Sequence, residues 1–95
     1  MSRAYVVGNV TIRDADKWAQ YVAEVPDTLT PWGGEILLRG RQAALLAGQA
    51  QHRNLVVLSF PDLDAIHRWY ASAAYQALIP LRDDAATVDL AAYEA

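Results

Sequence analysis

The chain has 95 residues, 54% of them hydrophobic and 20% charged, which predicts one small packed domain over residues 1–95 rather than a disordered segment. The formal net charge of −3, with no block of basic residues, argues against nucleic-acid binding. The absence of cysteine excludes disulfides, thiolate nucleophiles and cysteine-ligated metals.

The N-terminal segment MSRAYVVGNVTIRDAD contains an apolar run that is too short for a signal peptide or a membrane span, and it soon becomes charged. We therefore expect a soluble, cytoplasmic protein with no membrane partner.

The first elements are a strand and a helix. Residues 4–12 (AYVVGNVTI) are short and rich in β-branched side chains, which predicts a strand. Asp14 is expected to cap a helix that follows. The apolar face of this helix carries Trp18, Val22, Val25 and Leu29. Pro26 lies inside the pattern and is predicted to kink the helix or end it near Val25.

A hairpin of two strands is expected next. Pro31 and the pair Gly33–Gly34 end the helical segment, and residues 35–39 (EILLR) predict the second strand. A β-bulge at Gly40 would let this strand bend and continue through residues 42–47 (QAALLA), with a turn that begins at Gly48.

The C-terminal half repeats the order of strand, helix and strand. Residues 53–60 (RNLVVLSF) predict the third strand and residues 87–93 (TVDLAAY) the last one. Asp62 is the expected cap of a second helix, which breaks near Ser72 before a short helical piece over residues 73–81. The buried stripe of the second helix is predicted to be Leu63, Ile66, Trp69 and Tyr70.

The order β-α-β-β-α-β predicts an α+β fold, the ferredoxin-like plait, with a four-stranded antiparallel-type sheet and both helices on one face. The third strand is apolar on both faces, because Val56 and Leu58 alternate with Leu55 and Val57. A strand of this kind needs cover on both sides, and a second copy of the chain supplies it. We therefore expect a homodimer of the dimeric α/β-barrel type.

Several segments, namely WGGEILLRG, NLVVLSFPDLDAIHRWYASAAYQAL and LRDDA, resemble the bacterial domain-of-unknown-function 1330 family along nearly the whole chain. The family is placed in the dimeric α/β-barrel superfamily, whose members include small monooxygenases, lactone isomerases and haem-degrading enzymes. The resemblance therefore implies the fold and the dimer, but the family has no settled activity.

The chain departs from the family pattern at three positions. Ser59 stands where the family usually has an acidic residue, Asn9 where it often has an ionisable residue such as His, and Ala47 where it has Glu. A general acid or base at these positions would be missing here, which lowers the expectation of proton-transfer catalysis.

Asn9, Arg39 and Ser59 are the main candidate site residues. We expect the strands that carry Asn9 and Ser59 to be central, adjacent and parallel, so that the two side chains lie near one another. With a bulge at Gly40, the register brings Arg39 close to Ser59, which makes one polar cluster on an apolar sheet. If the second strand stops at Arg39 instead, Arg39 lies nearer Arg53; we favour the first register.

Arg39 is expected on the face that carries Leu37, toward the dimer core, at least half buried and within reach of Ser59 or Asn9. Two interpretations stay open: a structural ion pair with Glu35, Asp89 or a partner acid, or an anchor for a small organic anion. The remaining candidate ligand-binding residues are His52, Arg53 and Trp32.

The two histidines are too far apart to make a metal motif, and no glycine pattern for a nucleotide cofactor is present, so we expect neither a metal nor a cofactor. Two function classes remain. One is a homodimeric module that binds a small molecule such as a carboxylate, or has a structural role. The other is a cofactor-independent enzyme, similar to a monooxygenase or an isomerase, with its substrate between the sheet and the helices.

Overall fold

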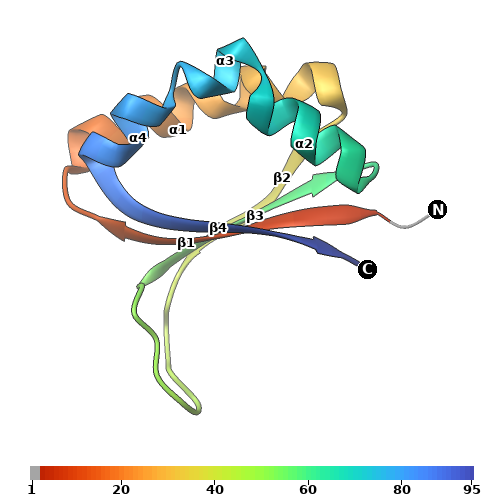
Figure 1. The fold of residues 1–95 in the computed structure, drawn as a ribbon. Helices are drawn as coiled ribbons and strands as arrows, with labels where there is room; N and C mark the ends of the chain where they lie inside the picture. The colour runs from red at the N-terminus through yellow and green to blue at the C-terminus, as the bar shows by residue number, and fades with distance from the viewer. Residues whose placement is uncertain (1–2) are drawn as a thin grey trace.

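The computed structural model describes residues 3–95 (Figure 1). In chain order the elements are β1 (Ala4–Ile12), α1 (Ala15–Leu29), the short 3-10 helix η1 (Thr30–Trp32), β2 (Glu35–Arg41), β3 (Asn54–Phe60), α2 (Leu63–Ala71), α3 (Ala73–Gln76), α4 (Ile79–Ala85) and β4 (Ala86–Glu94). The predicted β-α-β-β-α-β order is confirmed, with the region after α2 divided into two short helices.

The four strands form one antiparallel sheet in the order β2-β3-β1-β4. All the helices lie on the same side of this sheet, and Figure 1 shows that no element of residues 3–95 covers the other side. We call this second side the open face. The fold is therefore the α+β architecture that the element order predicts.

The expected pairing of β1 with β3 is wrong in its direction. The two strands are adjacent and central, but they run antiparallel, so Asn9 pairs with Leu55 and Ser59 pairs with Tyr5. The return of β3 from a hairpin with β2 reverses its direction relative to β1. Asn9 and Ser59 therefore lie at opposite ends of the sheet, and the predicted polar cluster does not form.

The β-bulge lies at Leu37 rather than at Gly40. Ile36 pairs with Leu58 and Leu38 pairs with Val57, so Leu37 is the extra residue. One additional residue reverses the side of the sheet to which later side chains point. Arg39 pairs with Val56, which faces the helices. The expectation that Arg39 faces a dimer core is therefore wrong.

The second strand is also shorter than predicted. It ends at Arg41, and residues 42–53 form a long irregular connection to β3 instead of continuing the strand. Figure 1 shows this connection projecting away from the body of the domain. We call residues 42–53 the arm. Leu46 on the arm is 94% exposed, so the apolar residues that suggested a strand have no cover among residues 3–95.

Helix α1 continues through Pro26 and does not end near Val25. Its buried positions Tyr21, Val25 and Leu29 stay in phase with the helical period across the proline. The burial of these side chains against the sheet offsets the backbone hydrogen bond that Pro26 removes. The predicted caps are confirmed: the side chains of Asp14 and Asp62 accept hydrogen bonds from the amides of Lys17 and Ala65 at 3.0 and 2.8 Å.

Trp69 of α2 is the centre of the core between the helices and the sheet, and only 1% of its surface is exposed. Its ring lies 5.3 Å from that of Phe60 and 4.3 Å from that of Tyr75, centroid to centroid. Its indole Nε1 donates a hydrogen bond of 3.0 Å to the hydroxyl of the buried Thr28. The aromatic contacts and this bond fix α2 against α1 and β3.

The pair Gly33–Gly34 joins η1 to β2. Gly33 has φ of 70°, in the left-handed region that favours glycine. Gly34 has no such angle, but a Cβ there would lie 2.7 Å from Cε2 of Phe60. Glycine is therefore required at both positions, for backbone conformation at Gly33 and for close packing at Gly34.

We predict that Gly33→Val and Gly34→Val each lower the free energy of unfolding by about 1–3 kcal/mol, through backbone strain in the first case and overpacking in the second. Gly40→Ala is the control, because a Cβ at Gly40 would meet only Cδ1 of Leu38, at 4.0 Å. Urea denaturation measures all three variants. Equal stability of the two valine variants and the control would contradict this account of the turn.

Candidate functional site

A groove with a volume of about 540 Å³ lies between α2 and β4. Its walls are mainly apolar, with the side chains of His67 and Tyr70 at its polar positions. The lining residues include Val6, Ile66, Trp69, Leu90 and Ala92. Ligand sites are commonly apolar hollows of roughly 300–1,000 Å³ with a few polar groups, so this groove has the size and character of a small-molecule site.

A smaller cavity lies deeper between α1 and the sheet, with a volume of about 30 Å³. Trp69 and Leu90 line both this inner cavity and the groove, so the two spaces share a wall. A cavity needs roughly 10–15 Å³ to hold one water, so the inner cavity has room for a water or for one small polar group of a ligand.

Arg39 lies on the wall of the inner cavity, together with Tyr21. The Arg39 residue is exposed, which contradicts the expectation that it is at least half buried. Within residues 3–95 its guanidinium makes neither an ion pair nor a hydrogen bond, so Glu35, Asp89, Asn9 and Ser59 are not its partners.

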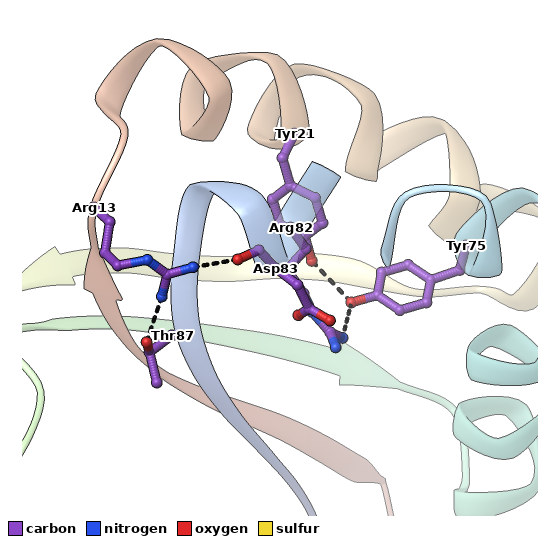
Figure 2. Close-up of polar contacts among 6 residues, drawn as sticks. All are labelled: Arg13, Tyr21, Tyr75, Arg82, Asp83 and Thr87. Atoms are coloured by element: carbon purple, nitrogen blue, oxygen red, sulfur yellow. Dashed lines mark hydrogen bonds and ion pairs between the residues drawn. The ribbon is translucent and has the colours of Figure 1, made fainter. Parts of the chain in front are cut away.

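Tyr21, Tyr75 and Arg82 form a polar network beside this cavity (Figure 2). The hydroxyls of Tyr21 and Tyr75 lie 2.9 Å apart in the buried core, and Nη1 of Arg82 donates to the Tyr75 hydroxyl at 3.1 Å. Arginine has no acceptor, so the oxygen of Tyr75 must accept this bond. The Tyr75 oxygen has a second lone pair, so either hydroxyl of the Tyr21–Tyr75 pair can be the donor; when Tyr75 donates, the hydrogen of Tyr21 is available for another acceptor.

The electrostatics keep Tyr21 neutral and Arg82 charged. Burial, together with the neighbouring Tyr75, raises the pKa of the Tyr21 phenol well above its usual range, although the charges of Arg82 and Arg39 act against this shift. Burial disfavours the charge of Arg82, but Tyr70, Tyr75 and Asp83 outweigh it and raise the pKa of the guanidinium. At neutral pH the lining of the inner cavity therefore includes the neutral phenol of Tyr21 and the guanidinium of Arg39, while the Arg82 cation is bonded to Tyr75 outside that lining.

A second arginine contact fixes the end of α4. The guanidinium of Arg13 donates to the hydroxyl of Thr87 and to the backbone carbonyl of Asp83 (Figure 2). Asp83 accepts a hydrogen bond of 3.1 Å from Nε of Arg82 through its carboxylate. These contacts hold the α4–β4 junction, and with it the side chain of Arg82, in place.

Two of the residues predicted to form the site have structural partners. Ser59 is only 2% exposed, and its hydroxyl oxygen accepts hydrogen bonds of 3.0 and 2.6 Å from Nε and Nη2 of Arg3. Trp32 is half-buried in η1 and packs against the hydrophobic core. Neither residue lines the groove or the inner cavity.

The structure brings three other predicted residues together at the base of the arm. Asn9, His52 and Arg53 line one pocket of about 290 Å³. His52 is held there by two contacts: its Nδ1 lies 2.8 Å from Oγ1 of Thr11, and its Nε2 lies 2.8 Å from Oδ2 of Asp89. Arg39 lines the inner cavity instead, so the predicted residues fall into separate places.

Over residues 3–95, no three His, Cys, Asp or Glu residues gather in a way that could hold a metal ion. Of the helices in that range, none is both long and apolar enough to span a bilayer.

The sequence analysis did not identify Tyr21, Tyr75 or Arg82 as site residues. Tyr21 lies three residues after Trp18, on the same face of α1, and a tyrosine on a buried face needs a hydrogen-bond partner. Arg82 belongs to the segment LRDDA, which carried part of the family resemblance. The sequence therefore indicates that Tyr21 and Arg82 are candidates. Their network with Tyr75 depends on how α1, α3 and α4 pack together, which residue spacing within one element does not predict.

Comparison with protein-family models gives a match for residues 3–95, described as a domain of unknown function (DUF1330). The chain belongs to the DUF1330 family. Among curated proteins, none matches this DUF1330 chain.

Solved structures similar to this DUF1330 protein agree on the fold. One is the RPA0582 protein of unknown function from Rhodopseudomonas palustris, with TM-score 0.82, 15% identity, and coverage of 97% of this chain and 81% of that one. Another is a dimeric ferredoxin-like protein of unknown function from Jannaschia, with TM-score 0.79, 10% identity, and coverage of 98% and 99%. The structural similarity shows that the chain has a ferredoxin-like fold. At identities this low it does not show a shared activity.

A third similar structure is SnoaB from Streptomyces nogalater, which is described as a cofactor-independent oxygenase. Its TM-score is 0.70 at 15% identity, and the match covers 100% of this chain and 94% of that one. The DUF1330 chain thus shares its fold with proteins of unknown function and with this oxygenase.

We predict that Tyr75→Phe lowers the free energy of unfolding by about 1–3 kcal/mol, because it leaves Arg82 and Tyr21 without their common hydrogen-bond partner. Gln20→Ala, at an exposed position of α1, is the control. In a double-mutant cycle, Tyr21→Phe and Tyr75→Phe are expected to be non-additive. Additive losses in urea denaturation would show that the two hydroxyls do not act together.

Proposed function

We propose that this DUF1330 protein is a homodimer that binds a small organic molecule in the cleft formed by the groove and the inner cavity. The observation that carries the proposal is the groove of about 540 Å³ between α2 and β4. It combines the apolar surfaces of Ile66, Trp69 and Leu90 with the polar groups of His67 and Tyr70. A planar or branched apolar ligand fits such walls, and the polar groups would orient it.

We propose further that the ligand carries a carboxylate or a similar anionic group. Neither the groove nor the inner cavity is lined by an Asp or Glu of residues 3–95, whereas Arg39 lines the inner cavity and Arg82 lies close to Tyr21. A cation that has no protein partner favours an anion, and guanidinium binds a carboxylate through a planar pair of hydrogen bonds. Tyr21 would add a neutral donor.

The proposed dimer rests on the open face. Leu55 and Val57 on this face are only partly covered, Leu38 is 48% exposed, and Tyr93 is 56% exposed. A sheet with apolar side chains on both faces and helices on one face needs a second cover. The similar Jannaschia protein is described as a dimeric ferredoxin-like protein, which supports a second copy as that cover.

A cofactor-independent enzyme that uses the same cleft is the second candidate. SnoaB, with a similar fold, is described as a cofactor-independent oxygenase. In this chain Tyr21 would serve as a hydrogen-bond donor and not as a base, because its raised pKa keeps the phenol protonated. Turnover of a bound ligand would favour the enzyme, and binding without turnover favours the first proposal.

We predict that Ala92→Phe abolishes ligand binding, because its side chain faces the helices and would fill the groove. The matched control is Ala23→Phe on the exposed side of α1. Ligand-observed NMR with a panel of small aromatic and aliphatic acids, and with their neutral amides, measures binding. The proposal fails if both variants bind the panel as the parent protein does.

We predict that Arg39→Met weakens binding of the acids by roughly tenfold or more, as expected for the loss of a charge-assisted hydrogen bond, and leaves binding of the amides nearly unchanged. Methionine keeps most of the apolar stem, so the fold is expected to persist. Arg68→Met on α2 is the control, since Arg68 pairs with Asp64 at the surface. An equal loss for acids and amides would argue against an anionic ligand.

We predict that Val57→Asp converts the dimer to a monomer or to an unfolded chain, because it places an unpaired charge in the proposed interface. Ala23→Asp, on the far side of the domain, is expected to remain a dimer. Light scattering coupled to size-exclusion chromatography gives the mass. A folded dimer of Val57→Asp would place the interface elsewhere.

A further inference from the structure

The pocket at the base of the arm lies away from the cleft. It opens between β1, the end of β2 and the start of β3, and it shares no lining residue with the groove or the inner cavity. Its volume is about 290 Å³, and its walls include Asn9, Gly40, Arg41, His52, Arg53 and Asn54. The proposed cleft ligand does not account for this concentration of polar and basic residues.

Gly40 lines the pocket and, having no side chain, leaves space within it. Gly40 and Asn9 pair with Leu55 from its two sides, so they flank it on the open face. A Cβ at Gly40 would meet only Cδ1 of Leu38, at 4.0 Å, so the space beside Gly40 is open. A larger residue at position 40 would therefore occupy the pocket without striking the protein.

His52 gives the pocket a fixed wall. Its ring joins the arm to the sheet through Thr11 on β1 and Asp89 on β4, and its side chain is only 11% exposed. Both ring nitrogens are engaged by these contacts, so His52 positions the arm and does not itself offer a free donor. The carboxylate of Asp89, the acidic group nearest to this wall, is likewise engaged with the imidazole.

The charge in the pocket is positive and unpaired. The guanidinium groups of Arg41 and Arg53 form no ion pair and no side-chain hydrogen bond with residues 3–95. No Asp or Glu of the described chain lines the pocket, and the amide of Asn9 supplies a further donor. Two guanidinium groups beside amide donors form the arrangement that recognises the oxygens of a carboxylate or a phosphate.

We propose that this pocket is a second binding site, for a small oxyanion, with Arg41 and Arg53 as the charged groups and Asn9 as a hydrogen-bond donor. The site lies where β2 ends and β3 begins, with Asn9 and Gly40 on the open face, at the rim of the proposed dimer interface. It does not depend on the cleft ligand, so a chain with an empty cleft still holds the anion. His52 is a positioning residue for this site.

The test is a titration of the isotope-labelled protein with inorganic phosphate and, separately, with acetate, followed by amide NMR shifts. The proposal expects saturable shifts at millimolar anion that are confined to residues 40–42 and 52–54, while the amides of Ile66 and Leu90 in the groove stay unchanged. Tighter binding of phosphate or of acetate then shows whether the site takes a phosphate or a carboxylate. Shifts spread evenly over the surface, or none at all, would overturn the proposal.

Two variants separate the site from a general charge effect. Gly40→Val is expected to fold normally and to lose the saturable shifts, and Arg41→Gln with Arg53→Gln is expected to weaken binding by roughly tenfold or more. Arg68→Gln is the matched control and keeps binding. Retention of binding by Gly40→Val, at an unchanged oligomeric state, would overturn the proposal. Ala92→Phe blocks the cleft and is expected to leave the anion-induced shifts unaltered. The two proposed sites can therefore be tested independently of one another.

Discussion

The helices cover only one face of the sheet, and the remaining features of this protein depend on that constraint. On the covered face, Trp69 fixes α2 against Phe60 and Thr28, and the space left beside it forms the cleft. On the open face, Leu55 and Val57 are only partly covered by the described chain. The same short sequence therefore builds the interior that is proposed to hold a ligand and the surface that is proposed to join a partner, with the sheet between them.

A single inserted residue decides on which side of the sheet Arg39 lies. The bulge at Leu37 turns Arg39 toward the helices, where it reaches the wall of the inner cavity. Gly40 has no side chain and leaves space within the pocket at the base of the arm. Arg39 lies beside the proposed cleft ligand, whereas Arg41 and Arg53 line the proposed oxyanion site. None of these three arginines forms an ion pair with an acid of residues 3–95.

Most of the fold could be predicted from the sequence, because it depends on local patterns. The caps at Asp14 and Asp62, the order of the elements and the positive φ of Gly33 follow from residue type and spacing. Pro26 was misleading because tertiary burial of α1 outweighs its local cost. The candidate site was predicted less well, because strand direction and bulge position decide which side chains meet. Neither is fixed by alternation within one strand.

The central claim is that the covered face holds a small organic molecule while the open face joins a second copy. Native mass spectrometry of freshly purified protein tests both parts at once, and Ala92→Phe provides the comparison. The account predicts a mass of two chains with an added small molecule for the parent protein, and two chains without it for Ala92→Phe. A monomer, or a dimer that gains no mass even after incubation with the acid panel, would contradict it.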